Sequence, residues 1–600
     1  MQREESALEC GVKRRFGPPA SEQPARLDRN GPKRRFTPHS KFFFFWLLLL
    51  LAAGLRAVAM ETPPRLMVVV SIDQFPREYL DRFAPLFGER GFRRLLEDGA
   101  DFRQAHHGHF VTATAPGHAV MLTGAYPNRN GVPGNWWYSR EHKRTVASVT
   151  DERFPALGAA EPEGFSPAAL SAPAVGDALR AATGMRAKVI AAAIKDRGSI
   201  MMGGQRPNAA YWYDPATCRF VSSTYYLPAL PEWVERFNAS DACTRYVGRH
   251  WQRLRDGADY ARYADRDDAP YERDVYGIGT TFPHPVREWS EARNRYAAVV
   301  GTPFGGELLA AFARAAIEAE ELGRDEVPDL LALSFSSNDY IGHTFGPHSQ
   351  EVLDATLRTD AVLAELMRYL DDEVGKDRWV LALTSDHGIA PVSEYLEQRG
   401  LLPVRDDHHR LPTAPARAAL ERALAQDFFA DDGAPKGFPG FVEAWERTEP
   451  FVYLNLAAIA RLRPPVSVES VERAARHHLE KTDGIERVYL RSELSALAAS
   501  RDPVEQMAYR NWHPERCGEL MVQLEPFWTA SEGRLATTHG QPYRYDTHVP
   551  LLLYGGGVRG GRIDRPVTVV DLASTLARLL GIAPPARDEG APLAEALRKN

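Results

Sequence analysis

Five short apolar runs constrain the fold of this chain more than any other feature of its sequence. Each contains five to seven residues that are nearly all apolar, and the runs are Leu66–Ile72, Val189–Ile194, Leu330–Phe335, Val380–Thr384 and Val549–Tyr554. Strands with one exposed face alternate apolar and polar residues, whereas strands of a parallel sheet are buried on both faces and form continuous apolar runs. We therefore predict a mostly parallel central sheet.

Longer segments with helical spacing of apolar residues lie between or after these runs, at Gly306–Glu321, Gln350–Val374 and Val569–Leu580. Strands that alternate with helices are typical of α/β domains, in which helices cover both faces of the sheet. With 600 residues and 44% hydrophobic content, the chain is long enough to bury a large core. The predicted fold is a doubly wound α/β domain that binds ligands at the carboxyl ends of its strands.

Two stretches lack this alternation of strands and helices. Residues 205–300 are rich in Tyr, Trp, Arg and Asp, and residues 400–510 mix helical segments with proline-rich turns. We interpret both as insertions around a core domain that spans residues 61–600, and we expect the second to form a compact cap.

The first 60 residues have the pattern of an export signal. Ten Lys and Arg residues within positions 1–41 precede a 14-residue apolar run, Phe42–Leu55, and the small-residue sequence Ala57-Val58-Ala59. These are the parts of a cleavable signal peptide, and the apolar run is shorter than the ~20 residues that cross a bilayer as a helix. We expect cleavage, no permanent membrane span and a periplasmic or secreted protein; an uncleaved signal anchor is the alternative.

Loss of residues 1–60 would make the chain more acidic. Eleven basic and five acidic residues lie there, so the formal net charge would change from -6 to -12. An acidic surface does not attract phosphate backbones, and nucleic acid is therefore not an expected partner.

Three cysteines remain after position 60, namely Cys218, Cys243 and Cys517. An exported protein permits a disulfide, for which Cys218 and Cys243 are the nearest pair. Three buried thiols fit the spacing equally well.

Polar residues follow four of the apolar runs, where the fold predicts ligand sites. They are Asp73, Lys195, Arg197, Asp339 and Asp386. His343 lies four residues after Asp339, so in a helix the two side chains project from one face and could hold one metal ion. Asp386-His387 and His539-Gly540 add further residues of metal-ligand type.

Thr114 lies in the sequence Val111-Thr-Ala-Thr-Ala-Pro-Gly-His118. Proline is tolerated in the first turn of a helix, so this segment places Thr114 at a helix N-terminus, facing an anion. Taken alone, such a threonine is an N-cap. The carboxylates and histidines of the other motifs favour the interpretation of Thr114 as a nucleophile.

These motifs resemble those of the alkaline phosphatase superfamily. The resemblance spans most of residues 61–600 and rests on Asp73, Thr-Ala-Pro-Gly-His at 114–118, Asn-Asp-Tyr-Ile-Gly-His at 338–343, Ser-Asp-His-Gly at 385–388 and Thr-His-Gly at 538–540. Within the superfamily, the chain is most similar to the PafA-like alkaline phosphatases, relatives of type I phosphodiesterases and nucleotide pyrophosphatases. This narrower likeness rests on Gly134-Asn135-Trp136-Trp137 and Ile194-Lys195-Asp196-Arg197-Gly198.

The resemblance implies a site with two zinc ions. One zinc would be held by Asp339, His343 and His539, and the other by Asp73, Asp386, His387 and the Thr114 oxygen. Thr114 would then form a phosphothreonine intermediate between two metals that clamp the attacking and leaving oxygens. His548 is the alternative to His539 as a zinc ligand. We prefer His539 because its His-Gly turn matches the family pattern.

Lys195 and Arg197 alternate along a segment that we expect to be extended, so both would face the non-bridging phosphoryl oxygens, and Asn135 would donate to the same oxygens. A monoester dianion carries more charge than a diester and gains more from two cations. We therefore expect a hydrolase of small phosphate monoesters that releases inorganic phosphate.

Three other functions are compatible with parts of the sequence. A nucleotide pyrophosphatase/phosphodiesterase shares the metal ligands, but Lys195-x-Arg197 is not expected there. A sulfatase needs Cys or Ser in a C/S-x-P-x-R motif, which residues 114–118 lack. An exported, non-catalytic binding protein could retain the fold, although the complete ligand set argues against it.

Overall fold

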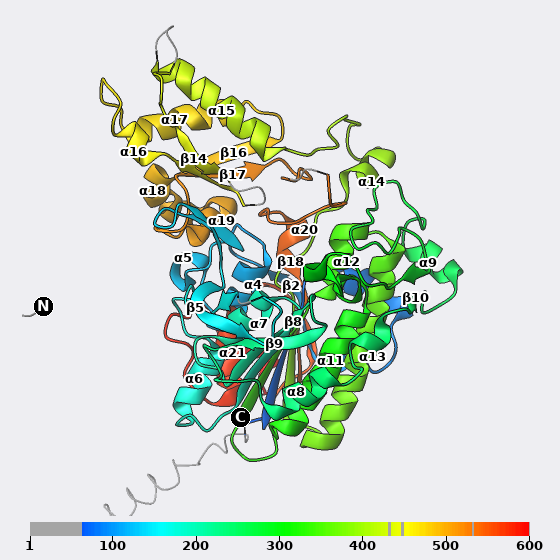
Figure 1. Ribbon diagram of the computed structural model, residues 1–600. Helices are drawn as coiled ribbons and strands as arrows, with labels where there is room; N and C mark the ends of the chain where they lie inside the picture. The colour runs from blue at the N-terminus through cyan, green and yellow to red at the C-terminus, as the bar shows by residue number, and fades with distance from the viewer. Residues whose placement is uncertain (1–62, 162, 430–433, 446–448, 531–532, 599–600) are drawn as a thin grey trace, which may run out of the picture. The chain divides into compact units, whose positions relative to one another are not determined.

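The computed structural model describes residues 63–161, 163–429, 434–445, 449–530 and 533–598 (Figure 1). The predicted signal peptide, residues 1–60, lies outside the described residues.

A twelve-stranded sheet forms the core of the fold. Its strand order is β18-β2-β19-β13-β1-β12-β7-β8-β9-β5-β6, and β20 also pairs with β2. Its centre is a run of five parallel strands in the order β13 (Trp379–Thr384), β1 (Leu66–Ile72), β12 (Asp329–Phe335), β7 (Val189–Ala193) and β8 (Ala209–Asp214). The flanking strands are β2 (Ala100–His106), β18 (His548–Val549), β19 (Leu551–Gly555), β20 (Gly561–Thr568), β9 (Arg219–Ser223), β5 (Thr150–Leu157) and β6 (Gly164–Phe165), and all their pairings are antiparallel except β2 with β20. The predicted α/β class with a mostly parallel centre is confirmed.

Four of the five apolar runs correspond to central parallel strands. The fifth differs, because Pro550 separates β18 from β19 and both strands run antiparallel to their neighbours. Proline has no N–H to donate to a strand ladder, so the run is interrupted there.

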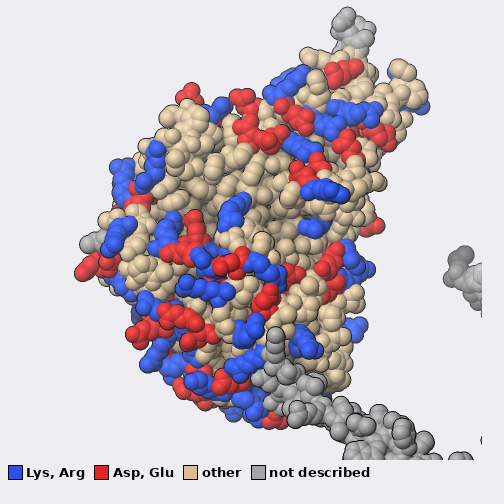
Figure 2. Space-filling view, turned by 180° about the vertical axis from the view of Figure 1, so that it is seen from behind, with Lys and Arg blue, Asp and Glu red and all other residues tan. Residues whose placement is uncertain are grey.

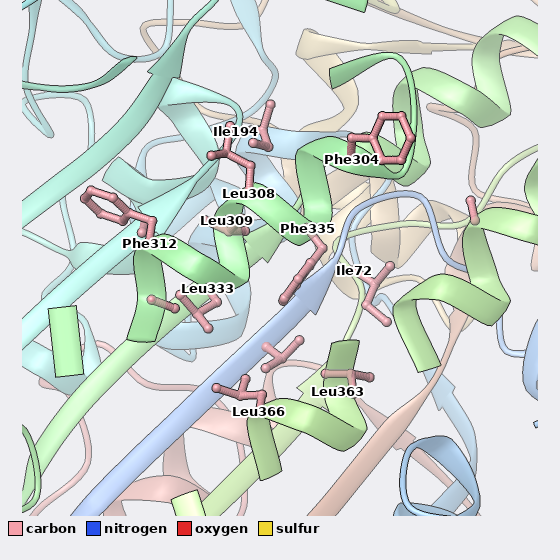
Figure 3. Close-up of a cluster of buried hydrophobic side chains, with 14 of the residues drawn as sticks. Ile72, Ile194, Phe304, Leu308, Leu309, Phe312, Leu333, Phe335, Leu363 and Leu366 are labelled. Atoms are coloured by element: carbon pink, nitrogen blue, oxygen red, sulfur yellow. The ribbon is translucent and has the colours of Figure 1, made fainter. Parts of the chain in front are cut away.

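Both faces of the sheet are buried, as the unbroken apolar runs predict. In β1, Leu66, Val68 and Val70 join one core cluster, whereas Met67 and Val69 join another on the opposite face. The first face is covered by α11 (Phe304–Ala319) and α13 (Gln350–Leu370), and the second by α4 (Thr114–Thr123), α6 (Val175–Ala182), α7 (Asp196–Gly203) and α21 (Asp571–Leu580). Figure 3 shows Leu308 and Phe312 of α11 with Leu363 and Leu366 of α13 in the first cluster.

A second sheet, with the antiparallel order β14-β15-β17-β16, lies apart from the first. Its strands are β14 (Val442–Trp445), β15 (Phe451–Leu454), β17 (Leu520–Leu524) and β16 (Ile485–Leu490), and α15 (Thr413–Phe428) and α17 (Val468–Leu479) pack on one face (Figure 1). The other face presents Tyr453, Tyr489 and Met521 to Phe110 and Val111. Most of this sheet comes from the stretch expected to form a cap, and it supports the chain that leads into Thr114.

The stretch 205–300, which we interpreted as an insertion, begins within the core, because β8 and β9 belong to the central sheet. They are followed by α8 (Glu232–Ala239), α9 (Gly257–Tyr263) and the paired short strands β10 (His250–Trp251) and β11 (His284–Pro285). A disulfide joins Cys218 to Cys243, with 5.9 Å between their Cα atoms, and Cys517 is a buried free thiol. This resolves the choice that the cysteine spacing left open.

The remaining elements are short. They are α2 (Glu78–Arg82), α3 (Phe92–Asp98), α5 (Pro127–Asn130), β3 (Trp136–Ser139), β4 (Arg144–Ala147), α10 (Ala297–Val300), α12 (Ser337–Phe345), α14 (Ser393–Gln398), α16 (Leu456–Ile459), α18 (Leu494–Ala499), α19 (Pro503–Asn511) and α20 (Arg544–Thr547). Within the described ranges, no single helix has both the length and the apolar composition to cross a membrane, although the bent pair α10–α11 meets that test jointly. Acidic and basic side chains are interspersed over the face shown in Figure 2.

Candidate active site

The carboxyl ends of four neighbouring strands bring most of the predicted site residues together. Asp73 directly follows β1, Lys195 follows β7, Asp339 lies in α12 after β12, and Asp386 and His387 follow β13. Because β13, β1, β12 and β7 are adjacent and parallel, these ends meet at one edge of the sheet.

Thr114 is the first residue of α4. The preceding Ala113 is extended, with φ -138° and ψ 166°, and no side-chain cap is present at this helix start. Lys195 Nζ instead donates to Thr114 Oγ1 at 3.2 Å. The hydroxyl therefore faces the strand ends and does not cap its own helix.

Gly117 allows α4 to lie close to the turn after β13. A Cβ at this position would be 2.2 Å from the carbonyl oxygen of Asp386 and 2.7 Å from its Cβ. Only glycine fits at that distance, so the Thr-Ala-Pro-Gly motif brings the helix carrying Thr114 against the Asp386 backbone.

Asp339, His343 and His539 form the first ligand group, in which one atom from each residue lies within 4.8 Å of the others. Asp339 Oδ1 is 3.3 Å from His343 Nε2 and 3.6 Å from His539 Nε2. Asp339 and His343 share one face of α12, as their four-residue spacing predicts. The structure brings together the three residues that the sequence assigned to one metal.

The second group combines Asp73, His387 and again Asp339. Asp73 Oδ1 lies 3.5 Å from His387 Nε2. Asp386, which the sequence places in this set, lies at its edge: its Oδ2 is 3.4 Å from His387 Nε2, while its Oδ1 accepts from the backbone N–H groups of Gln74 and His387. Asp339 therefore lies between the two groups, which the sequence treated as separate.

The hydrogen bonds of the three imidazoles suit metal binding. Each Nδ1 faces a backbone carbonyl, that of Thr537 for His343 (2.9 Å), Gly388 for His387 (2.9 Å) and Thr112 for His539 (2.7 Å). A carbonyl only accepts, so each Nδ1 carries a proton and Nε2 is the nitrogen that can face a metal. At His343, burial alone would lower the pKa of the ring, but the charge of Asp339 raises it above its ordinary value. Burial lowers the pKa of His387 and His539 well below the ordinary value, which keeps both rings neutral.

Several buried polar atoms at this edge lack a hydrogen-bond partner among the described residues. They include Asp73 Oδ1, Asp386 Oδ2 and His387 Nε2. Leaving such acceptors unsatisfied costs free energy, and a bound cation would satisfy all three. The donor set of three carboxylates and three imidazoles thus fits a metal centre.

Lys195 connects this centre to the threonine. Its Nζ is 2.5 Å from Asp339 Oδ2 and 2.9 Å from Asp73 Oδ2. Burial alone would lower the pKa of Lys195, but the two carboxylates raise it above its ordinary value. A charged ammonium group therefore stays beside Thr114 Oγ1.

Arg197 differs from its predicted setting. It lies in the first turn of α7, which begins at Asp196, and not on an extended segment with Lys195. Its guanidinium lies 5.6 Å from the centre of the Trp136 ring and 3.6 Å from Asp196 Oδ1. Because α7 already begins at Asp196, the side chains of Lys195 and Arg197 contact different neighbours.

Asn135 lies beside the start of α4. Its Oδ1 accepts from Ala115 N at 2.8 Å, which leaves the Nδ2 amide as its donor group. The backbone N–H of Asn135 donates to Glu449 Oε1 at 2.8 Å. Glu449 is 314 residues away in the chain, and no sequence motif indicated its contribution.

The other histidines near the motifs lie outside both ligand groups. His548, the rival of His539, bonds the Arg103 carbonyl oxygen through Nε2 at 2.8 Å and stacks on His106. His118 uses Nδ1 toward the Thr114 carbonyl oxygen and Nε2 toward Ser334 Oγ, and burial lowers its pKa to about 4. Protein partners thus occupy the ring nitrogens that a metal would need.

Gln74 and Asn338 are two further polar residues at this edge that the sequence analysis did not single out. Gln74 Nε2 donates to Asp339 Oδ1 at 2.8 Å, and Asn338 Nδ2 donates to the carbonyl oxygens of Asp73 and Gln74, both at 2.9 Å. Each residue adjoins a predicted ligand, Asp73 or Asp339, and that position was the available signal.

The central parallel sheet carries two candidate metal-binding groups and the threonine that begins α4 at its strand ends, which defines the protein as an α/β protein with a metal-type site. Comparison with known proteins narrows this class. Residues 67–548 match the family model of type I phosphodiesterase / nucleotide pyrophosphatase, and the chain belongs to this family.

Similar proteins include alkaline phosphatases from several bacteria. The chain is 32% identical to alkaline phosphatase PhoV of Synechococcus elongatus, over 89% of this chain and 93% of that protein, and 29% identical to alkaline phosphatase PafA of Elizabethkingia meningoseptica, over 89% and 94%. It is also 34% identical, over 89% and 95%, to a Myroides odoratus protein named as a calcium-transporting ATPase. The crystal structure of wild-type PafA superposes with a TM-score of 0.80 at 28% identity, covering 89% of this chain and 99% of that one.

These similarities extend over nearly the whole described chain. They identify the protein as an enzyme of the alkaline phosphatase type, which hydrolyses phosphate monoesters. The two acid–imidazole groups are its candidate metal-binding groups.

Proposed function

We propose that the protein is an exported, zinc-dependent phosphate monoester hydrolase in which Thr114 is the nucleophile and phosphothreonine is the intermediate. The observation that carries this proposal is the set of contacts made by Lys195. Its ammonium group joins Thr114 Oγ1 to Asp73 and Asp339, two carboxylates of the acid–imidazole centre.

Two zinc ions would complete this centre. Asp339, His343 and His539 would hold one ion, and Asp73, Asp386, His387 and the Thr114 oxygen would hold the other. Bound zinc lowers the pKa of a coordinated hydroxyl and neutralises charge on a phosphoryl group. Neutral imidazoles with free Nε2 lone pairs, together with carboxylates, are ligands typical of zinc.

The reaction that this arrangement supports has two displacements at phosphorus. The Thr114 hydroxyl gives up its proton and its oxygen forms a bond to phosphorus as the bond to the leaving oxygen breaks; the departing alkoxide takes up one proton in exchange. A water oxygen then forms a bond to phosphorus as the bond between phosphorus and the Thr114 oxygen breaks; one water proton goes to the Thr114 oxygen, and inorganic phosphate leaves. Lys195 stabilises negative charge at the Thr114 oxygen, while Arg197 and Asn135 Nδ2 hold non-bridging oxygens.

The two cations favour monoesters over diesters, because a monoester dianion presents one more negative charge to them. The names of the similar alkaline phosphatases PhoV and PafA agree with this preference. The second candidate is a phosphodiesterase, which the name of the matching family favours.

The disulfide supports the export part of the proposal. Cys218–Cys243 requires an oxidising compartment, and the predicted signal peptide would lead to one. Cell fractionation followed by N-terminal sequencing should find a chain that begins near residue 61 outside the cytoplasm. A full-length chain in the membrane would support the uncleaved anchor instead.

Turnover of an aryl phosphate monoester and its matching diester by residues 61–600 tests the chemistry. Thr114→Ala should abolish monoester turnover. The double variant Lys195→Ala/Arg197→Ala should lose about a hundredfold or more in monoester kcat/KM and much less with the diester. Arg314→Ala, a change at an exposed position of α11, is the matched control. A wild-type preference for the diester would favour the phosphodiesterase, and no turnover of either substrate would favour a binding protein.

Metal dependence has a separate test. Elemental analysis of the purified protein should find two zinc ions per chain, and chelation should remove both the ions and the activity. Zinc should restore turnover more fully than magnesium or calcium, because three of the seven proposed ligands are imidazoles, which suit zinc, whereas the harder ions prefer oxygen ligands alone. Full activity with a chelator present would contradict the metal proposal.

A further inference from the structure

Gln74 combines two unusual properties. It directly follows the candidate ligand Asp73, and it has a positive φ of 61° although it is not glycine. The left-handed region costs a residue with a Cβ about 1–2 kcal/mol. A non-glycine residue persists in such a conformation when surrounding contacts hold it there.

The contacts of Gln74 reach two other candidate ligands. Its backbone N–H donates to Asp386 Oδ1 at 3.1 Å, and its side-chain Nε2 donates to Asp339 Oδ1 at 2.8 Å. Carboxylates only accept, so the amide nitrogen must be the atom that faces Asp339. One residue therefore orients a carboxylate on each neighbouring strand end.

Both carboxylates still face the imidazoles when these bonds are made. Asp386 Oδ2 keeps no hydrogen-bond partner among the described residues and lies 3.4 Å from His387 Nε2. Asp339 Oδ1 accepts the Gln74 amide on one side and faces His343 and His539 on the other. Each carboxylate is thus held in orientation without losing its lone pair toward the imidazoles.

The surroundings hold the Gln74 turn from three directions. Asn338 Nδ2 donates to the carbonyl oxygens of Asp73 and Gln74, and Phe75 N donates to Ser385 Oγ at 2.9 Å. In α12, Gly342 makes room for the Gln74 amide, because a Cβ there would lie 1.8 Å from Gln74 Oε1. The packing is therefore matched to a glutamine at position 74.

We propose that Gln74 is a positioning residue that fixes the carboxylate of Asp339 for metal binding through its side chain and that of Asp386 through its backbone. This inference rests on the proposed metal function of the two ligand groups. Since the two contacts use different parts of the residue, they can be separated by mutation.

Gln74→Gly is the decisive variant. It removes the amide, keeps the backbone N–H that bonds Asp386, and relieves the left-handed strain. We measure the two zinc affinities by chelator competition and the Tm of the metal-free protein, using the full chain as produced by the host. The zinc affinity of the site held by Asp339, His343 and His539 should weaken by about tenfold to a hundredfold, that of the other site should change much less, and the metal-free Tm should not fall.

Two more variants control for indirect effects. Gly342→Ala should displace the Gln74 amide and weaken the same zinc site without a change at residue 74. Gln74→Glu should weaken that site further, because it replaces a donor to Asp339 with a like charge. Unchanged affinities in Gln74→Gly would overturn the inference, as would equal weakening of both sites with a lower metal-free Tm. A wild-type protein that binds no zinc would instead overturn the proposed function beneath it.

Discussion

Glu272 is a buried acid outside both ligand groups. Its residue is 6% exposed, and neither carboxylate oxygen has a hydrogen-bond partner among the described residues. Burial, followed by the charge of Glu351, raises the pKa of Glu272 to about 10. Glu351 has a partner in His284 Nε2 at 3.0 Å, so Glu272 is the acid that stays protonated at neutral pH.

This raised pKa predicts a stability that falls as pH rises. The usual glutamate pKa is 4.5, so from there to about 10 the native state holds a proton that the unfolded chain has lost. Glu272→Gln cannot ionise and should escape this loss. The Tm of the variant minus that of the wild type should therefore grow between about pH 6 and pH 9. Glu235→Gln, at an exposed position of α8, is the control, and a difference that does not change with pH would contradict the assignment.

At the scale of elements, the site depends on how closely α4 approaches the turn after β13. The contact is set by Gly117, where a methyl group would meet the backbone of Asp386 and no flexible side chain could yield. Thr114 and Asp386 lie on the two sides of this contact. A small separation of the two elements should therefore affect catalysis more than folding.

Gly117→Ala tests this contact. The extra methyl should cost about 1–3 kcal/mol of unfolding free energy and lower kcat strongly, because α4 must move away from Asp386. Gly257→Ala in α9 is the matched control, since nothing lies within 4 Å of a Cβ there. Calorimetry and monoester kinetics would check both variants, and a Gly117→Ala enzyme with wild-type kcat would show that the close approach is dispensable.

The elements were the most predictable level of this structure. Continuous apolar runs identified β1, β7, β12 and β13, because strands buried on both faces leave a local signal. The sequence did not predict the start of α7 at Asp196, because Lys-Asp-Arg has no marked helical signal. For the same reason it did not predict that Lys195 and Arg197 have different neighbours. The position of Asp339 between both ligand groups and the support from Glu449 depend on contacts across hundreds of residues, which local patterns do not encode.

At the scale of the whole described chain, the disulfide is a covalent cross-link within the stretch 205–300, which has few regular elements. Cys218 and Cys243 are 25 residues apart and both pack in the larger core cluster. A closed loop of this kind chiefly restricts the unfolded chain. The bond should therefore stabilise the fold without shaping the active site.

Cys218→Ser/Cys243→Ser should lose about 2–4 kcal/mol of stability while its kcat at room temperature stays near that of the wild type. The Tm measured with and without a thiol reductant checks this. Reductant should lower the Tm of the wild type and leave that of the variant unchanged. A reductant effect of equal size on both proteins would mean that the bond does not stabilise the native state.

The pairing of β2 has a consequence for the order in which the molecule is made. This strand lies at residues 100–106, yet its partners are β18, β19 and β20, from residues 548–568. During synthesis from the N-terminus, β2 is made first, and more than two thirds of the chain must follow before any strand that pairs with it exists. His539 emerges from the ribosome just ahead of those partners, so the sheet edge and the full ligand set are completed at almost the same moment. A chain that stops short of this point has neither, and the enzyme can gain its chemistry only after His539 and these partner strands have been made.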